Sequence, residues 1–503
     1  MERSSQVALM KEMNSRSERT AIWLGPKPGF DWRCLATHRS DIVVFRHQNP
    51  NAENTIDIPV KSYSETCHVS AELPGWDDRL WSDLRRLMGT RWFSRIWVIQ
   101  EVVLSSKGPI ILHGKPIFSW ERLAWAVGWL RRNGYMNFAQ IPETLRNVDT
   151  ISNLRRTPSS WPLDALMSIT QIKLLCFISE TRSLRPDYSL TVARAYRKVA
   201  AYLLRKSRSL ALLTRAYGLP TDSTRRKRVH DIQGLPFWAP DWSDFRVFDR
   251  DIRTSLSWVH YIILTEPPQL GYSRNFDASA GHGLELHTGS DDSILLASGI
   301  ILATIGKVIV FNEAEMSRED FKKCLQFKLR DAWNISAPVL SGAKVIDCIT
   351  QFVETTTAEQ HALIGRTWEQ SLTDGAAYLI QLLQDEETQV ALPFQENRES
   401  ILGSLKRRSI GGEPEDYAVL ALKYCFSRCF FVTSTGHIGI GPSNTEVGDY
   451  VSVIMGGGVP YVLRSNGSNR HFVGESYVEG YMRGEALQEC QQGSVQMAVL
   501  NIM

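Results

Sequence analysis

The stretch RWFSRIWVIQEVVLS at residues 91–105 places one carboxylate among residues that otherwise belong in a protein core. Ser94 is a favourable N-cap residue, so the pattern predicts a helix that runs from Ser94 to about Val103. On that helix Trp97 and Glu101 are four residues apart and therefore lie on one face. Glu101 is thus expected at the edge of a core, beside an indole ring.

A carboxylate in such a place has two interpretations. An unpaired buried carboxylate is costly, so an arginine is expected to reach Glu101, and Arg91 and Arg95 are the nearest candidates. The ion pair would then orient the helix, with Trp92 and Trp97 as core residues. The alternative is that Glu101 faces an open cleft at the carboxyl end of a parallel sheet, where open α/β folds place their ligands.

Other motifs give weaker support for chemistry. The Gly-Gly-Gly sequence at 456–458 lacks the Lys-Ser/Thr pair of a phosphate loop and predicts a hairpin turn. Glu475, Glu479 and Glu485 lie in a turn-rich strand region and are expected to face solvent. The histidines show no His-Glu-x-x-His spacing, and no Gly-x-Ser-x-Gly sequence occurs. We therefore predict neither a metal site nor a serine hydrolase.

The composition is that of a multidomain globular protein. A chain of 503 residues is too long for one core, which predicts two or three domains. The apolar fraction of 43% and the fifteen tryptophans indicate large aromatic cores rather than disorder. A net charge of +3 is small for this length, so the sequence gives no electrostatic reason to expect a nucleic-acid partner.

Several features predict a cytoplasmic protein that does not enter a membrane. The apolar stretch 294–311 contains Gly299, Gly306 and Lys307, and it fits two short strands better than a membrane helix. The first residues are polar and charged, unlike a signal peptide. The eight cysteines are scattered without paired spacing, which is typical of free thiols in a reducing compartment.

Local patterns predict the organisation along the chain. Residues 2–17 form an amphipathic helix, 19–24 a buried strand, and 76–104 a helical segment broken near Gly89, which together indicate an α/β module. The expected regions are a partial α/β domain at 1–104, a helical middle at 105–289, a mixed α/β connection at 290–425 and a β-barrel at 426–490.

The tail predicts a small antiparallel β-barrel, because Gly- and Asn-rich turns follow one another at short spacing after residue 429. Residues 430–486 are expected to form one compact unit. Its strands should carry Val451, Val453, Val462 and Leu463. Gly448 and Asp449 are expected to form a turn rather than a ligand site.

A series of motifs occurs in an order known from one protein family. The first is Glu2-Arg3-x-x-Gln6-Val7 leading to Trp23-Leu24-Gly25, and the second is a block with Trp92, Ser94, Arg95, Trp97, Gln100 and Glu101. Further along are Pro186-Asp187-Tyr188, Leu235-Pro236-x-Trp238-x-Pro240-Asp241-Trp242, Gly448-Asp449-x-Val451, Gly474 and Gly484-Glu485-Ala486. In this combination they resemble the fungal heterokaryon incompatibility (HET) proteins, in which a β-barrel region follows the HET domain.

The resemblance implies an incomplete HET domain at 1–104. The Ser-Tyr-x-Trp-Gly and Asp-Ala-x-Cys-Ile-x-Gln blocks that usually open the domain do not occur in this sequence. The fold implied is a TIR/flavodoxin-like parallel sheet without its first strands. The strand at 19–24 is then expected at or near an exposed sheet edge, and exposed edges favour association, so self-association is possible.

The function implied by the resemblance is nonself recognition between fungal strains, with programmed cell death promoted through protein contacts and no cofactor. An alternative is a TIR-like hydrolase that cleaves NAD. Glu101 would then stabilise the ribosyl oxocarbenium ion as nicotinamide leaves, a role that carboxylates have in glycosidic cleavage. A third possibility is an inactive remnant. The other family-motif residues are expected to be structural, and NAD consumption by the wild type and by Glu101→Gln distinguishes the alternatives.

Overall fold

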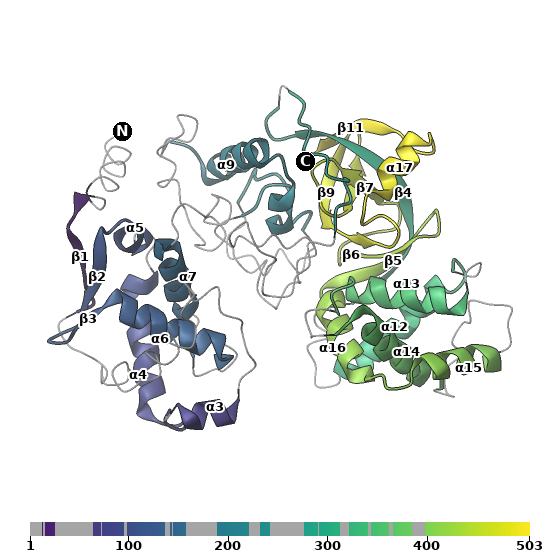
Figure 1. The fold of residues 1–503 in the computed structure, drawn as a ribbon. Helices are drawn as coiled ribbons and strands as arrows, with labels where there is room; N and C mark the ends of the chain where they lie inside the picture. Colours follow the sequence, from purple (N-terminus) through teal and green to yellow (C-terminus); the bar gives the residue numbers. More distant parts are fainter. Residues whose placement is uncertain are drawn as a thin grey trace. The chain divides into compact units, whose positions relative to one another are not determined.

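The computed structural model of the chain divides into two compact units. Unit 1 comprises Met1–Leu190 with His260–Leu270, and unit 2 comprises Thr191–Val259 with Gly271–Met503. Figure 1 shows the secondary structure of both. The structure describes residues 13, 16–25, 64–71, 73–94, 98–135, 141–142, 144–156, 189–220, 232–241, 276–289, 291–311, 321–340, 344–361, 366–384 and 398–503.

The described sheet of unit 1 has three strands, β1 (Arg19–Trp23), β2 (Lys107–Leu112) and β3 (Ile117–Ser119). β1 pairs in parallel with β2 and lies at the edge, while β2 and β3 are antiparallel. The prediction of a parallel strand at 19–24 is confirmed, and among the described strands it lies at the edge. The prediction that this strand is buried is wrong for most of it, because an edge strand packs only alternate side chains inward: Ile22 is 1% exposed whereas Trp23 is 57% exposed.

The described helices of unit 1 begin where the sequence offers capping groups. Asp78 accepts a hydrogen bond from the backbone of Leu80 at 2.7 Å, and Ser119 accepts one from Arg122 at 3.3 Å. The predicted break near Gly89 is confirmed, since the second helix ends at Met88. The helices are α3 (Glu65–Ser70), α4 (Arg79–Met88), the 3₁₀ helix η3 (Arg91–Ser94), α5 (Val98–Val103), α6 (Trp120–Arg132) and α7 (Thr144–Arg156).

Stacked aromatic rings join the helices at one end of unit 1. The rings of Trp76 and Trp81 have centroids 4.8 Å apart, and His68 lies 5.2 Å from Trp76 and 5.8 Å from Tyr135. Trp81 and Tyr135 are almost completely buried. Aromatic pairs at such distances stabilise a core beyond the area that they bury, so this cluster fixes α3 and α4 against the end of α6.

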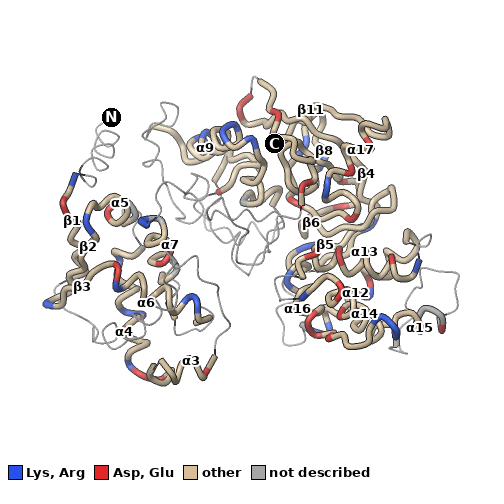
Figure 2. The backbone as a smooth tube through the Cα atoms, in the orientation of Figure 1, with Lys and Arg blue, Asp and Glu red and all other residues tan. Residues whose placement is uncertain are grey.

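The described helices of unit 2 lie around one large sheet. They are α9 (Val192–Ser207), the 3₁₀ helix η7 (Ala211–Arg215), α12 (Phe321–Ser336), α13 (Val345–Thr357), α14 (Trp368–Gln384), α15 (Arg398–Arg408), α16 (Pro414–Cys425) and α17 (Glu485–Gln491). The helices α12, α13 and α16 contact the sheet through β4, β5 and β6, and α14 packs on α13 and α16 (Figure 1). Charges of both signs are spread over these elements (Figure 2).

The described sheet of unit 2 has eight strands in the order β10-β6-β5-β4-β11-β9-β8-β7, with an additional pairing of β4 with β7. The strands are β4 (Leu295–Val310), β5 (Arg428–Thr433), β6 (Ile438–Pro442), β7 (Tyr450–Ile454), β8 (Tyr461–Asn466), β9 (Asn469–Glu475), β10 (Tyr477–Val478) and β11 (Met497–Ile502). The predicted valines and Leu463 lie on β7 and β8. The prediction of a small antiparallel barrel at 426–490 needs correction. The sheet is larger, it includes β4 and β11 from outside that range, and β9 and β11 are parallel.

Residues 294–311 form one long strand rather than the two short strands predicted. β4 pairs with β11 through Leu295–Ile300, with β7 through Gly299–Thr304 and with β5 through Ile305–Val310. Gly299 does not break the strand. A Cβ atom there would lie 2.7 Å from Leu500 and 2.9 Å from the carbonyl oxygen of Val453, so glycine permits the close approach of two neighbouring strands.

We predict that the tail cannot fold without β4. A fragment of residues 426–490 leaves β5 and β7 without their β4 partner and β9 without β11, so it should show no cooperative thermal unfolding. A fragment of residues 191–503 retains these strands and should unfold cooperatively. Circular dichroism of the two fragments checks this expectation, and a cooperative transition in the shorter fragment would contradict it.

Candidate functional site

Glu101 lies in the first turn of α5 and is half-buried. Its Oε2 atom accepts a hydrogen bond from the indole Nε1 of Trp92 in η3, at 3.1 Å. The Trp92 ring is buried in edge-to-face contact with Phe93 and Trp120, with ring centroids 5.0 Å and 5.9 Å away. The carboxylate therefore connects α5 to an aromatic cluster.

A second contact holds the other end of α5. The Nη1 atom of Arg155 on α7 donates to the carbonyl oxygens of Val102 at 2.7 Å and of Ser105 at 2.6 Å. Burial lowers the pKa of Arg155, and Arg156 lowers it further, while Glu121 opposes the change. This guanidinium thus satisfies carbonyl groups that the end of a short helix leaves without intrahelical partners.

The structure differs from the predicted helix in this block. α5 begins at Val98, whereas Ser94 belongs to η3, so the prediction that Ser94 is the N-cap of this helix is wrong. Ser94 is the last residue of η3, and α5 begins only four residues later, so Ser94 is too far from α5 to cap it. Arg95 and Trp97 lie outside the described residues, as does the side chain of Gln100. The arginine partner expected for Glu101 therefore stays a prediction.

In unit 2, Gly448 and Asp449 form the turn before β7. Gly448 has φ +95°, which favours glycine. Asp449 is buried, and its Oδ2 atom accepts a hydrogen bond from the backbone of Glu446 at 2.8 Å. Arg464 on β8 donates to both carboxylate oxygens, from Nε at 2.8 Å and from Nη2 at 2.9 Å. These bonds to Asp449 raise the pKa of Arg464, opposed by burial.

The remaining family-motif residues also have backbone roles. Gly474 lies opposite Val462 at an irregularity in the β8–β9 pairing and has φ +153°. Gly484 has φ +93°, and a Cβ atom there would lie 2.6 Å from Ala280. Glu485 begins α17 and accepts a hydrogen bond from the backbone of Arg483 at 2.7 Å.

Glu475 does not face solvent, contrary to the sequence-based expectation. It is 1% exposed and forms an ion pair with Arg428, which is fully buried, with Nη2 and Oε1 2.9 Å apart. The expectation failed because the last four residues of β9, 472–475, are buried in succession, so both faces of the strand are covered there. A buried pair of this kind offsets the large cost of taking each charge out of water.

A further polar cluster surrounds the hydroxyl group of Tyr477 on β10. Tyr477 Oη lies 2.8 Å from Glu359 Oε1 and 2.7 Å from Glu479 Oε2. Arg483 also donates to both oxygens of Glu359. Glu359 follows α13 in a left-handed conformation, with φ +55°, next to Ala358 with φ +47°. This unusual turn points Glu359 towards β10.

The geometry of the cluster requires an extra proton. Tyr477 has one proton to donate, so it can satisfy only one carboxylate, and the other contact is a hydrogen bond only when that carboxyl group is protonated. Burial raises the pKa of Glu479 to about 7, with Glu354 and Glu359 also raising it, while Tyr477 and Arg483 lower it. Below about pH 7 Glu479 is therefore the group that carries the proton, and Glu359 is the carboxylate paired with Arg483.

Sequence reasoning missed this cluster. Tyr477 and Glu479 are two residues apart around a strand, which places both side chains on one face, and this local signal was available. Glu359 is more than a hundred residues away in sequence, and no local pattern connects it to β10. Burial also raises the pKa of Glu354, whose Oε1 atom accepts a hydrogen bond from Trp368 at 2.6 Å.

No described group of three or more His, Cys, Asp or Glu side chains is placed to hold a metal ion. Among the helices that the structure describes, none combines the length and the apolar character that a membrane crossing requires.

Comparison with protein families identifies the class of protein. A family model described as "Heterokaryon incompatibility protein (HET)" matches residues 1–101, in unit 1. A second model, described as "Het-6 beta-barrel domain", matches residues 338–494, in unit 2. The two matches confirm the predicted resemblance to a heterokaryon incompatibility protein with a carboxy-terminal barrel region. No significant match is found among curated proteins or solved structures.

The cluster around Tyr477 generates a prediction for pH dependence. Because the folded-state pKa of Glu479 is raised, its contribution to stability is fully present below the unfolded value of about 4.5 and is lost as the pH rises through about 7. Glu479→Gln keeps a neutral hydrogen-bonding group at this place. It should therefore flatten the fall in the thermal midpoint of unfolding between about pH 5 and about pH 8.

The matched control is Glu489→Gln. Glu489 accepts from the hydroxyl of Tyr481 at 3.1 Å, so it is also a carboxylate bonded to a tyrosine, but without a second carboxylate described at that hydroxyl group. Glu489→Gln should therefore show the same pH dependence of the thermal midpoint as the wild type. Equal profiles for wild type and Glu479→Gln would refute the proton assignment.

Proposed function

We propose that this chain acts in nonself recognition between fungal strains and promotes programmed cell death through contacts with protein partners. The observation that carries the proposal is the presence of both family matches in one chain, the HET match in unit 1 and the β-barrel match in unit 2. Cytoplasmic localisation belongs to the same proposal, and it rests on the sequence features alone.

In this proposal Glu101 has a structural role. The hydrogen bond from Trp92 occupies one carboxylate oxygen, and Arg155 holds the end of the same helix. NAD cleavage, the alternative that the sequence raises, would need this carboxylate to face a bound ribosyl group. The contact with the buried Trp92 ring supports the structural role instead.

The two roles predict different results for substitutions of Glu101. Glu101→Gln retains an oxygen that can accept the Trp92 N–H, so a structural role predicts a folded protein and unchanged cell killing. Glu101→Leu removes the acceptor, so the indole N–H of Trp92 loses this hydrogen bond, which should cost about 1–3 kcal/mol of stability. The measurements are cell death on expression in a fungal strain, cellular NAD content and thermal unfolding.

A catalytic role predicts the opposite for the isosteric variant. Glu101→Gln would then fold normally, lose cell killing and lose any consumption of NAD that the wild type shows. That result would overturn the structural assignment of Glu101. Family membership does not depend on this outcome.

A second part of the proposal is self-association through β1. In the described part of unit 1, β1 pairs with β2 on one side and no strand pairs with its other side. Trp23 on this strand is 57% exposed. An edge strand with an exposed aromatic residue can pair with an equivalent strand of a second chain.

Trp23→Lys should weaken this association, because a charge on an edge strand opposes strand pairing. We expect the dissociation constant of the self-associated form to rise about tenfold or more. The control is Val69→Lys on α3, which is 66% exposed but does not belong to the sheet. Analytical ultracentrifugation of the three proteins is the measurement. Equal effects of both substitutions would exclude β1 as the site.

A further inference from the structure

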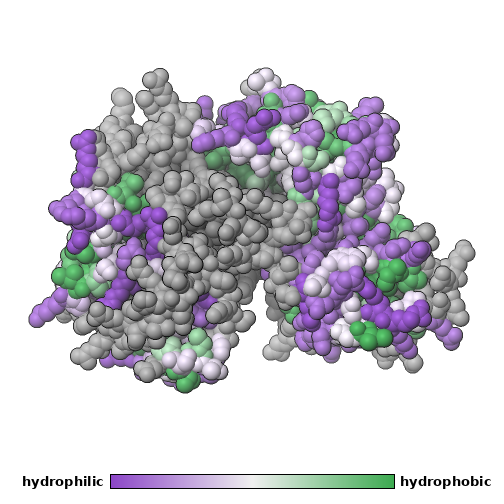
Figure 3. Space-filling model, in the orientation of Figure 1, coloured by the Kyte–Doolittle hydropathy of each residue, from purple (hydrophilic) through white to green (hydrophobic). Residues whose placement is uncertain are grey.

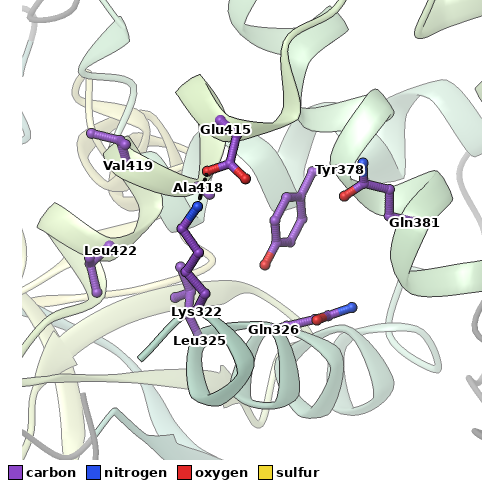
Figure 4. A pocket seen from close by; sticks show the side chains of 9 residues that line it. All are labelled: Lys322, Leu325, Gln326, Tyr378, Gln381, Glu415, Ala418, Val419 and Leu422. Carbon is purple, nitrogen blue, oxygen red and sulfur yellow. Dashed lines mark hydrogen bonds and ion pairs between the residues drawn. The ribbon is translucent and has the colours of Figure 1, made fainter. Parts of the chain in front are cut away.

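A pocket of about 280 Å³ lies between three helices of unit 2, α12, α14 and α16 (Figure 4). Both α12 and α16 pack on β5, and α14 packs along α16, so the pocket is the space that remains above the sheet between α12 and α16. Its wall is mostly apolar, with Leu325 from α12 and with Ala418 and Leu422 from α16. A short side chain at Ala418 leaves this space open.

Among the polar residues that line the pocket Tyr378 is the most buried, and its phenol reaches from α14 into the pocket with its hydroxyl towards α12 (Figure 4). Its ring is packed against Tyr417, with centroids 5.1 Å apart, and the Tyr417 hydroxyl is hydrogen-bonded to Thr356 at 2.8 Å. These contacts hold the ring of Tyr378 in place.

The Tyr378 hydroxyl is available to a ligand. Burial raises its pKa well above the ordinary value, and Glu415 raises it further, so the hydroxyl is neutral at physiological pH. None of the hydrogen bonds between described residues uses it. The side-chain amide of Gln326 lies on the α12 side of the pocket, towards which this hydroxyl points, whereas the exposed Gln381 lies beside the other end of the Tyr378 side chain (Figure 4). The hydroxyl and the Gln326 amide can together donate to and accept from one polar substituent.

The charged residues at the pocket restrict what can enter. Lys322 on α12 and Glu415 on α16 form an ion pair, with Nζ and Oε2 2.9 Å apart. The two charges neutralise each other, so the pocket offers no net charge to an ionic ligand. The pair also crosses from one helix to the other (Figure 4), and this crossing interrupts any continuous groove in which a partner helix could lie.

We propose that this pocket binds a small uncharged, largely apolar molecule with one hydrogen-bonding substituent, which the hydroxyl of Tyr378 recognises together with the amide of Gln326. Apolar walls with a few placed polar groups are the usual design of small-molecule sites, and the volume lies just below their range of roughly 300–1,000 Å³, which fits a small ligand. On the face shown in Figure 3, apolar groups also occur separately elsewhere on both units. The proposal does not depend on the role of Glu101 or on self-association.

The test uses the full chain and two probes of the same shape, 2-naphthol and naphthalene, with binding measured by fluorescence titration. Wild type should bind 2-naphthol in a saturable manner and more tightly than naphthalene. Tyr378→Phe keeps the ring and removes the hydroxyl, so it should weaken 2-naphthol binding roughly two- to tenfold and leave naphthalene unchanged. The anionic analogue 2-naphthoate should bind more weakly than 2-naphthol.

Ala418→Leu provides the second variant. Its larger side chain fills the pocket and should weaken both probes more than tenfold, with folding confirmed by circular dichroism. Should Ala418→Leu fail to fold, the comparison of the two probes on Tyr378→Phe decides alone. Absence of saturable 2-naphthol binding by the folded wild type overturns the proposal, as does an equal change, or no change, for both probes in Tyr378→Phe.

Discussion

The pairing of β4 with three other strands is the constraint on which unit 2 depends. One strand of sixteen residues, Leu295–Val310, forms hydrogen bonds with β11, β7 and β5 in succession. Through it the strands on either side belong to one sheet, and α12 packs on its surface. β4 lies outside residues 338–494, where the barrel family model matches, so the matched segment completes its sheet with a strand that precedes it.

Three buried carboxylates in or beside this sheet share one arrangement. Asp449 receives the guanidinium of Arg464, Glu475 that of Arg428, and Glu359 that of Arg483. In each case the arginine and the carboxylate come from different turns or strands, so each pair fixes the position of one segment relative to another. Arginine suits this use because its planar donors match the two oxygens of a carboxylate.

The sequence predicts those parts of the fold that local patterns determine. The alternating valines between Gly-rich turns predict strands where β7 and β8 are found, and the predicted break near Gly89 coincides with the end of α4. The presence of Gly299, Gly306 and Lys307 in 294–311 predicts two short strands, whereas in the structure Gly299 lies within one strand and admits Leu500 and the backbone of β7. The Tyr477 cluster was not predictable for a related reason, since Glu359 reaches it only through tertiary packing.

The ion pair of Arg428 and Glu475 has a consequence for how this protein can diverge. Loss of either partner alone strands a buried charge, at a cost of about 3–5 kcal/mol, whereas replacing both with apolar residues of similar size is often neutral. A single substitution at either position is therefore selected against. A lineage can replace the pair only by exchanging both residues together or through an uncharged intermediate. Among relatives, these two positions should accordingly change as a unit, and the correlation would record their contact.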